Sequence, residues 1–249
     1  MRTAKAFSQK GFTLVELVIV IIILSALGIM TSSYIGTGVD IYTDITERDK
    51  SLSSVRFVME RLRREVANAL PNSASISDSG DVLNGCLTFR PIVASTLYAS
   101  DFPIEPISRV SGAIATIPVD DYTFKSGDQA VVYLLSADEI INTGKVKTLV
   151  DDTTNSSLVF SDADGFVLAS PAKRVYIIRD TISYCFIGSE LKRQENSGDF
   201  VLMAEHISGS FSASDATLQR NALVKVTFNL DFDDMEVPIE QTLHISNVP

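Results

Sequence analysis

An apolar segment close to the N-terminus constrains this chain more than any other feature. From Phe12 to Met30 every residue is apolar or glycine except Thr13, Glu16 and Ser25. At about 1.5 Å per residue, a helix of this length spans close to the ~30 Å hydrocarbon core of a bilayer. Residues 1–11 before it are basic and contain no acid, so they should stay in the cytoplasm. The segment therefore predicts a helix that crosses the inner membrane and leaves everything after about residue 32 on its outer face.

Two ordinary explanations compete for this segment. A secretory signal peptide has the same basic start and apolar run, and Ala26-Leu27-Gly28 offers a small-x-small cleavage site. A simple single-span anchor also fits. Neither explains Glu16, because an unpaired carboxylate inside an apolar span costs at least ~2.5 kcal/mol. A charge at this position needs a partner.

The residues around Glu16 carry a family resemblance. Gly11-Phe12-Thr13-Leu14-Val15-Glu16 resembles the G-F-T-L-x-E motif of class III signal peptides, which type IV pilins and the pseudopilins of type II secretion share. The resemblance implies that a prepilin peptidase cuts after Gly11 and methylates the new amino group of Phe12. It also implies that Glu16 pairs with the N-terminal cation of a neighbouring subunit during assembly. The implied partners are other major and minor pilins or pseudopilins, contacted through the N-terminal helix, and the inner-membrane assembly platform.

A second apolar pattern follows the span, in which residues recur mostly at spacings of three and four with charged residues between them. It predicts an amphipathic continuation of the helix over residues 34–70, either continuous with the first half or kinked near Gly36 and Gly38, and stopped by Pro71. The expected organisation is a cleaved leader at 1–11, a membrane-spanning assembly helix at 12–33, this continuation, and a periplasmic head at 71–249. The apolar positions are Ile35, Val39, Tyr42, Leu52, Val55, Met59, Leu62, Val66 and Ala69.

The head contains short runs in which apolar and polar residues alternate, as they do in half-buried strands. The clearest run is 224–232, with a partner at 237–245 and a turn at Asp233-Asp234 between them. The sequence therefore predicts an α+β fold, in which a long N-terminal helix packs on a mainly antiparallel β-sheet head. Further strands are expected at 130–135, 158–160, 175–187, 191–194 and 200–207.

Several short blocks in the body extend the resemblance at lower specificity. They are similar to the MshO-type minor pilins of mannose-sensitive haemagglutinin pili. Major pilins are generally smaller, so the large head also favours a minor subunit. The J-type pseudopilin of type II secretion is the nearest rival. The blocks are Arg64-Glu65, Asn68 to Ser73, Cys86 to Pro91, Ser183 to Cys185 and Ser246 to Pro249.

The two cysteines, Cys86 and Cys185, are far apart in sequence and form no C-x-x-C pair. This spacing disfavours a zinc site. If the body lies outside the cytoplasm, a disulfide is the default expectation, and two separately buried thiols are the alternative. The bond would close a long loop and stabilise the fold by ~2–4 kcal/mol.

The charge of the chain argues against nucleic acid as a partner. The formal net charge is -10, and removal of a leader that carries Arg2, Lys5 and Lys10 makes it -13. Such a body repels phosphate backbones. Asp162-Ala163-Asp164-Gly165 opens like a calcium loop, but no third acid and no closing glutamate follow. We therefore predict no metal and no other cofactor, and we interpret Asp120-Asp121, Asp151-Asp152 and Asp233-Asp234 as solvated turns.

Nothing in the sequence points to catalysis. His206 and His244 lie in or beside predicted strands, and no serine-hydrolase, zinc-protease, Walker or dinucleotide motif occurs. We predict no catalytic residue and no enzyme activity. The favoured hypothesis is a minor pilin at or near a fibre tip that helps to start polymerisation. The rivals are a binding module, whose head recognises a surface sugar or protein, and a periplasmic enzyme on a signal anchor.

Overall fold

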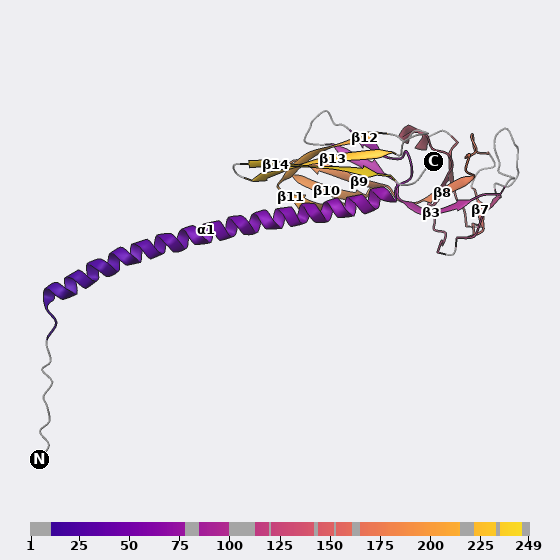
Figure 1. Ribbon diagram of the computed structural model, residues 1–249. Coiled ribbons are helices and arrows are strands. Elements are labelled where there is room, and N and C mark those ends of the chain that lie inside the picture. The colour runs from indigo at the N-terminus through magenta and orange to yellow at the C-terminus, as the bar shows by residue number, and fades with distance from the viewer. Residues whose placement is uncertain are drawn as a thin grey trace, which may run out of the picture. The chain divides into compact units, whose positions relative to one another are not determined.

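The computed structural model describes residues 11–77, 85–99, 113–119, 121–141, 144–151, 153–160, 165–214, 222–232 and 235–245. Figure 1 draws these residues as ribbons. Their contacts divide the chain into two units, Met1–Lys50 and Ser51–Pro249. The predicted leader lies outside the described residues apart from Gly11.

One helix, α1 (Leu14–Ala67), begins directly after the proposed cleavage site. It passes through Gly36 and Gly38 without a break, so the continuous alternative is correct. The helix ends before the predicted stop at Pro71. The reason is that the next residues turn to pair with a distant segment: the N–H of Ile92 donates to the carbonyl of Asn68 at 3.0 Å, and the N–H of Leu70 donates to that of Arg90 at 2.8 Å.

The predicted apolar face of the continuation is buried only in its second half. Ile35 and Tyr42 are 64% and 72% exposed, whereas Val55 and Leu62 are 1% and 0% exposed. Packing on the head begins at Leu52, which lies against the core. The α+β prediction of a long helix on a mainly antiparallel head is confirmed.

Two antiparallel sheets enclose one core with the second half of α1, which runs beside their strands (Figure 1). The core joins four helix residues, Val55, Val58, Leu62 and Val66, to side chains from both sheets. The five-stranded sheet has the order β1 (Ser75–Ser77), β2 (Cys86–Phe89), β9 (Ile182–Ile187), β10 (Glu190–Glu195) and β11 (Val201–Glu205). The three-stranded sheet has the order β12 (Ile207–Ser214), β13 (Leu223–Phe232) and β14 (Met235–His244).

A second lobe is inserted between β2 and β9, which are neighbours in the five-stranded sheet. We call residues 92–178 the inserted lobe. One core lies around Val175 and Ile177, and a second lies around Leu134 and Ile178 and is shared with Leu70 from the segment after α1. It contains a four-stranded sheet of order β3 (Ile92–Leu97), β8 (Arg174–Ile178), β5 (Gln129–Val131) and β6 (Val146–Thr148), a ribbon of β4 (Ala113–Ala115) and β7 (Ser157–Val159), and the 3-10 helix η1 (Ala137–Ile140).

The predicted strands agree with the structure where alternation is strong. The pair at 224–232 and 237–245 corresponds to β13 and β14, paired from Leu223 to Phe232. The strand expected at 130–135 is shorter, because Tyr133 adopts a positive φ of 51° just after β5. The run at 175–187 divides into β8 and β9, which belong to different sheets. The run at 200–207 is interrupted at His206, whose φ is 56°.

Candidate functional site

The first turn of α1 holds the residues that the sequence singles out. The N–H of Glu16 donates to the Thr13 hydroxyl at 3.3 Å, and the N–H of Leu17 donates to the Thr13 carbonyl at 3.3 Å. Thr13 therefore acts as the N-cap, and Thr13 with Glu16 has the spacing of a capping box. This geometry fixes Glu16 in the first turn, where the positive end of the helix dipole stabilises a carboxylate.

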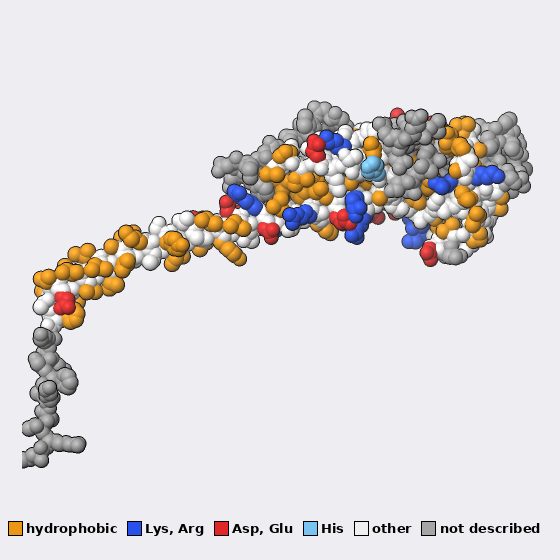
Figure 2. Space-filling model, viewed as in Figure 1, with side chains coloured by type: hydrophobic (Ala, Val, Ile, Leu, Met, Phe, Trp, Pro, Cys, Tyr) orange, Lys and Arg blue, Asp and Glu red, His pale blue; other side chains and the backbone are white. Residues whose placement is uncertain are grey.

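Glu16 stands alone on an apolar surface. Phe12 and Leu14 beside it are 74% and 78% exposed. Figure 2 shows the start of α1 as a largely hydrophobic surface. Within the described part of the chain, no cation pairs with the Glu16 carboxylate. A counter-charge for this carboxylate would have to come from another molecule or from outside the described residues.

The same segment can lie in an apolar medium. It is long enough to cross a membrane, with a mean hydropathy of 2.7 in its most apolar window. Two of its hydroxyl groups donate inside the helix: Ser25 to the carbonyl of Ile21 at 2.7 Å, and Thr31 to that of Leu27 at 2.9 Å. Helices in lipid need this internal satisfaction of polar groups.

Comparison with known families concerns the same residues. Residues 6–32 match the family model of the prokaryotic N-terminal methylation motif. The methylation motif covers Gly11, Phe12 and Glu16 and supports a structural, type IV pilin-like protein with an inner-membrane helix. Comparisons with curated proteins and with solved structures found no match. Cleavage after Gly11, methylation of Phe12 and the pairing of Glu16 stay predictions.

The second half of α1 is fixed to the head through a polar cluster. Tyr184 donates to Glu65 at 2.9 Å, and Nε of Arg193 lies 3.2 Å from the same carboxylate. Arg61, one turn before Glu65 on the helix, donates to it at 3.0 Å. Burial raises the pKa of Tyr184, and the nearby charge of Glu65 raises it further. Burial lowers the pKa of Arg193, but Glu195 and Glu65 outweigh this effect and raise it. The cluster therefore joins the helix to two neighbouring strands of the five-stranded sheet through the Glu65 carboxylate.

The two cysteines lie at the base of the inserted lobe. Cys86 of β2 is directly opposite Cys185 of β9, and the two are joined by a disulfide with a Cα–Cα distance of 4.1 Å. The bond closes a loop with a sequence separation of 99, which contains the whole inserted lobe. The redox state in the cell stays a prediction. Sequence reasoning paired these residues from the compartment alone and did not place them in register.

The block from Asn68 to Ser73 forms the joint between α1 and the inserted lobe. Asn72 is 1% exposed, and its side-chain amide donates to the carbonyl of Leu134 at 3.0 Å. Its φ of 57° is one that asparagine tolerates better than most residues. Sequence reasoning noted this block only as a resemblance. The Pro-Asn pair after a helix was the available signal for a tight turn.

A buried ion pair in the inserted lobe was missed by sequence reasoning. Asp128 is fully buried, and Nε of Arg179 lies 2.6 Å from its Oδ1. Tyr122 donates to Asp128 at 2.9 Å, and the N–H of Lys125 donates at 3.0 Å. Burial favours a higher pKa for Asp128, but the hydrogen bonds, led by that from Arg179, lower it below its ordinary value. Because Arg179 lies between β8 and β9, the pair fixes the return of the chain from the inserted lobe.

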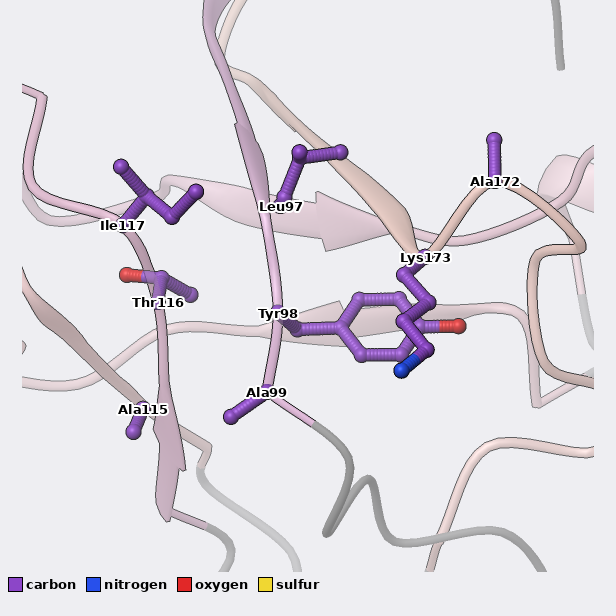
Figure 3. Close-up of a pocket in the computed structure, with 8 residues that line it drawn as sticks. All are labelled: Leu97, Tyr98, Ala99, Ala115, Thr116, Ile117, Ala172 and Lys173. Atoms are coloured by element: carbon purple, nitrogen blue, oxygen red, sulfur yellow. The ribbon is translucent and has the colours of Figure 1, made fainter.

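The inserted lobe also contains a pocket of about 390 Å³ (Figure 3). Tyr98 is anchored there by Ser170, whose N–H donates to the Tyr98 hydroxyl at 2.9 Å. Apart from the amine of Lys173 and the hydroxyls of Tyr98 and Thr116, the lining side chains are apolar. The lining residues are Leu97, Tyr98, Ala99, Ala115, Thr116, Ile117, Ala172 and Lys173.

The remaining polar candidates do not converge on a site. His206 and His244 are both exposed, and His206 forms the turn between β11 and β12. Among the residues that the structure describes, no three histidine, cysteine or acidic side chains are grouped as metal ligands. Asp120, Asp152, Asp162, Asp164, Asp233 and Asp234 lie outside the described residues.

Proposed function

We propose that this chain is a minor pilin that takes part in initiation or tip assembly of a type IV pilus of the mannose-sensitive haemagglutinin kind. The observation that carries the proposal is the apolar start of α1, which matches the methylation motif and holds Glu16 in its first turn with no cation paired to it among the described residues. Before assembly the helix anchors the chain in the inner membrane as a single span, with the head in the periplasm. During assembly the helix moves into a fibre.

The proposed chemistry begins with processing. Cleavage after Gly11 creates a cationic amine on Phe12, and methylation keeps that charge. In an apolar bundle of helices both this amine and Glu16 would be costly if unpaired. Pairing Glu16 of one subunit with the amine of a neighbour satisfies both charges. Because the Thr13 cap fixes Glu16 within the first turn, the carboxylate lies near the level of the chain's own N-terminus.

The finer assignment to the haemagglutinin pili is supported by the short sequence blocks and by the size of the head. Four of these blocks take part in the architecture, since Tyr184 of the fourth block donates to Glu65 of the first and Cys185 of the fourth forms the disulfide. Asn68 to Ser73 forms the joint to the inserted lobe, and Cys86 of the third block contributes to the disulfide. A J-type pseudopilin would share the methylation motif and the helix, so a secretion role is the close alternative.

An adhesive binding module is the second candidate, and the inserted lobe favours it. This lobe has a core of its own around Val175 and Ile177, and none of its described strands belongs to the two sheets that pack on α1. Its pocket combines apolar walls with the amine of Lys173. A lobe of this kind can lie on the surface of a fibre, where it is free to bind a receptor, without taking part in helix packing.

Deletion of the gene distinguishes these functions. We expect loss of all fibres, counted by electron microscopy, and recovery when the full chain is supplied in trans. Normal fibres with lost adhesion would favour the binding module. Normal fibres with a loss of protein secretion would favour the pseudopilin, and normal fibres with neither defect would contradict the proposal.

A further inference from the structure

The second half of α1 presents a charged face away from the sheets. Helical geometry of 100° per residue places it opposite the buried stripe of Val55, Leu62 and Val66. The face contains a large apolar side chain, since Phe57 is 59% exposed. We call this surface the arginine face, and its residues are Arg56, Phe57, Glu60, Arg63 and Arg64.

Two of the three arginines of this face bond to one carboxylate, that of Glu60. Arg63 donates to Glu60 through Nε at 3.0 Å and through a second nitrogen at 3.1 Å, and Arg64 donates through Nε at 2.8 Å. The hydrogen bonds from Arg63 and then Arg64 lower the pKa of Glu60 to about 2. Each guanidinium has five N–H donors, so most donors still point outward. With Arg56, the face carries three cations against one anion.

This charge is opposite to that of the chain that follows the helix. Residues 51–67 contain four arginines and two glutamates, a net charge of +2. Residues 68–249 contain 12 basic and 24 acidic residues, a net charge of -12. Any subunit with a head of similar composition would be attracted to the arginine face and repelled elsewhere.

We infer that the arginine face is a docking surface for the acidic head of a neighbouring pilin-like subunit. The inference rests on the proposed function, because it assumes that subunits are brought together through their helices. An exposed aromatic side chain among arginines has the composition of a protein interface centre. The face is held firmly in position, since the same helical segment is fixed to the sheet by Glu65 and its partners.

An anionic lipid surface is the other partner that would attract arginines. The sequence between the apolar span and the arginine face opposes it, because this stretch contains four carboxylates and only two cations. The carboxylates are Asp40, Asp44, Glu47 and Asp49, and the cations are Arg48 and Lys50. Lipid phosphates would meet the carboxylates first. The face therefore fits an acidic protein surface better than a membrane.

The test is crosslinking with the full chain in intact envelopes. A photo-reactive amino acid is placed at Ser53, which is exposed and lies on the same side of α1 as Arg56 and Arg64. The variant is Arg64→Glu. Its matched control is Lys225→Glu on β13, since both side chains are exposed members of an ion pair, with Glu60 at 2.8 Å and Glu240 at 3.0 Å. We expect Arg64→Glu to reduce crosslinks to pilin-like heads about tenfold, and Lys225→Glu to change them less than twofold.

A second photo-reactive amino acid, placed at Val20 in the apolar half of α1, distinguishes failure of this inference from failure of the proposed function. Crosslinks from Val20 together with the Arg64-specific loss at Ser53 support the inference. Crosslinks from Val20 with no effect of Arg64→Glu, or with capture of lipid alone at Ser53, overturn the inference and leave the proposed function standing. Absence of pilin-like partners at both positions contradicts the proposed function itself. High salt should weaken the Ser53 crosslinks and not those from Val20.

Discussion

The two halves of α1 have the same backbone and opposite surroundings. In the first half, apolar side chains such as Leu27 are exposed, at 52%, and the hydroxyls bond back to the helix. In the second half, Leu62 is fully buried against the sheets while arginines face outward. The apolar stripe from Val55 to Val66 is buried within the chain, whereas the apolar surface of the first half is exposed. This exposed surface is the reason that we propose an assembly function for the first half.

Glu16→Leu tests the first half most severely. The change makes the span more apolar, so membrane insertion and processing at Phe12 should survive. Docking should fail, because the amine of the neighbouring subunit loses its counter-charge. We expect few or no fibres by electron microscopy and an unchanged, methylated N-terminus by mass spectrometry.

Glu47→Leu is the matched control, because Glu47 is an exposed glutamate on the same helix beyond the apolar span. It should assemble normally. If Glu16→Leu assembled like the parent, Glu16 would act only as a signal for the peptidase.

Asp128→Asn tests the second unit through its buried ion pair. It removes the buried counter-charge of Arg179, which then keeps only the attraction of Asp180, and should lower the free energy of unfolding by ~3–5 kcal/mol at neutral pH. Since the pKa of Asp128 is lowered in the folded state, its stabilisation is complete above the ordinary aspartate pKa and is lost as the pH falls through the folded value. The parent should therefore lose stability below about pH 4, and the variant should lose less over the same range.

Urea unfolding of the full chain in detergent, followed at several pH values by circular dichroism, measures both effects. Asp121→Asn is the control, because Asp121 is exposed. Equal acid sensitivity of the parent and Asp128→Asn would show that other carboxylates dominate.

A pair of identical substitutions compares the two halves of the helix directly. Leu62→Ala removes a fully buried side chain and should lower the stability of the head by ~2–5 kcal/mol. Leu27→Ala removes a side chain that is 52% exposed and should change it by less than ~0.5 kcal/mol. Urea midpoints of both variants in one detergent give the comparison. Equal losses would contradict a division of the helix into an assembly half and a packing half.

Loss of the disulfide should also affect only the second unit. Replacing both Cys86 and Cys185 with serine should destabilise the head by ~2–4 kcal/mol, because the closed loop contains the inserted lobe. Crosslinks from Val20 should persist. Peptide mapping without reductant should recover the two cysteines as one linked pair from the parent, and free thiols in fresh envelopes would contradict the pairing.

The sequence predicted elements whose pattern is local. The apolar span, the stripe through Leu62 and the alternation of β13 each follow from spacing alone. The insertion of residues 92–178 between two adjacent strands did not, because strand pairing across such a distance leaves no local signal. The Asp128 ion pair was missed for the same reason, since its partner Arg179 is distant in sequence. At the candidate site the motif named Gly11, Phe12 and Glu16, and the structure added the cap.

The smallest effect is expected from Thr13, which connects processing and assembly within one turn. Thr13→Ala removes the acceptor for the N–H of Glu16 and should cost the first turn about 1 kcal/mol. The rest of α1 does not depend on this turn, so the span should insert and the head should fold as before. A smaller fraction of subunits should hold Glu16 in helical position, so fibre number should fall several-fold without reaching zero.

Thr13→Ser keeps the hydroxyl and should restore assembly. Thr31→Ala is the control, because its hydroxyl bonds inside the helix to the carbonyl of Leu27 and caps nothing. If Thr13→Ser failed as Thr13→Ala does while Phe12 was still processed, the cap would not be what positions Glu16.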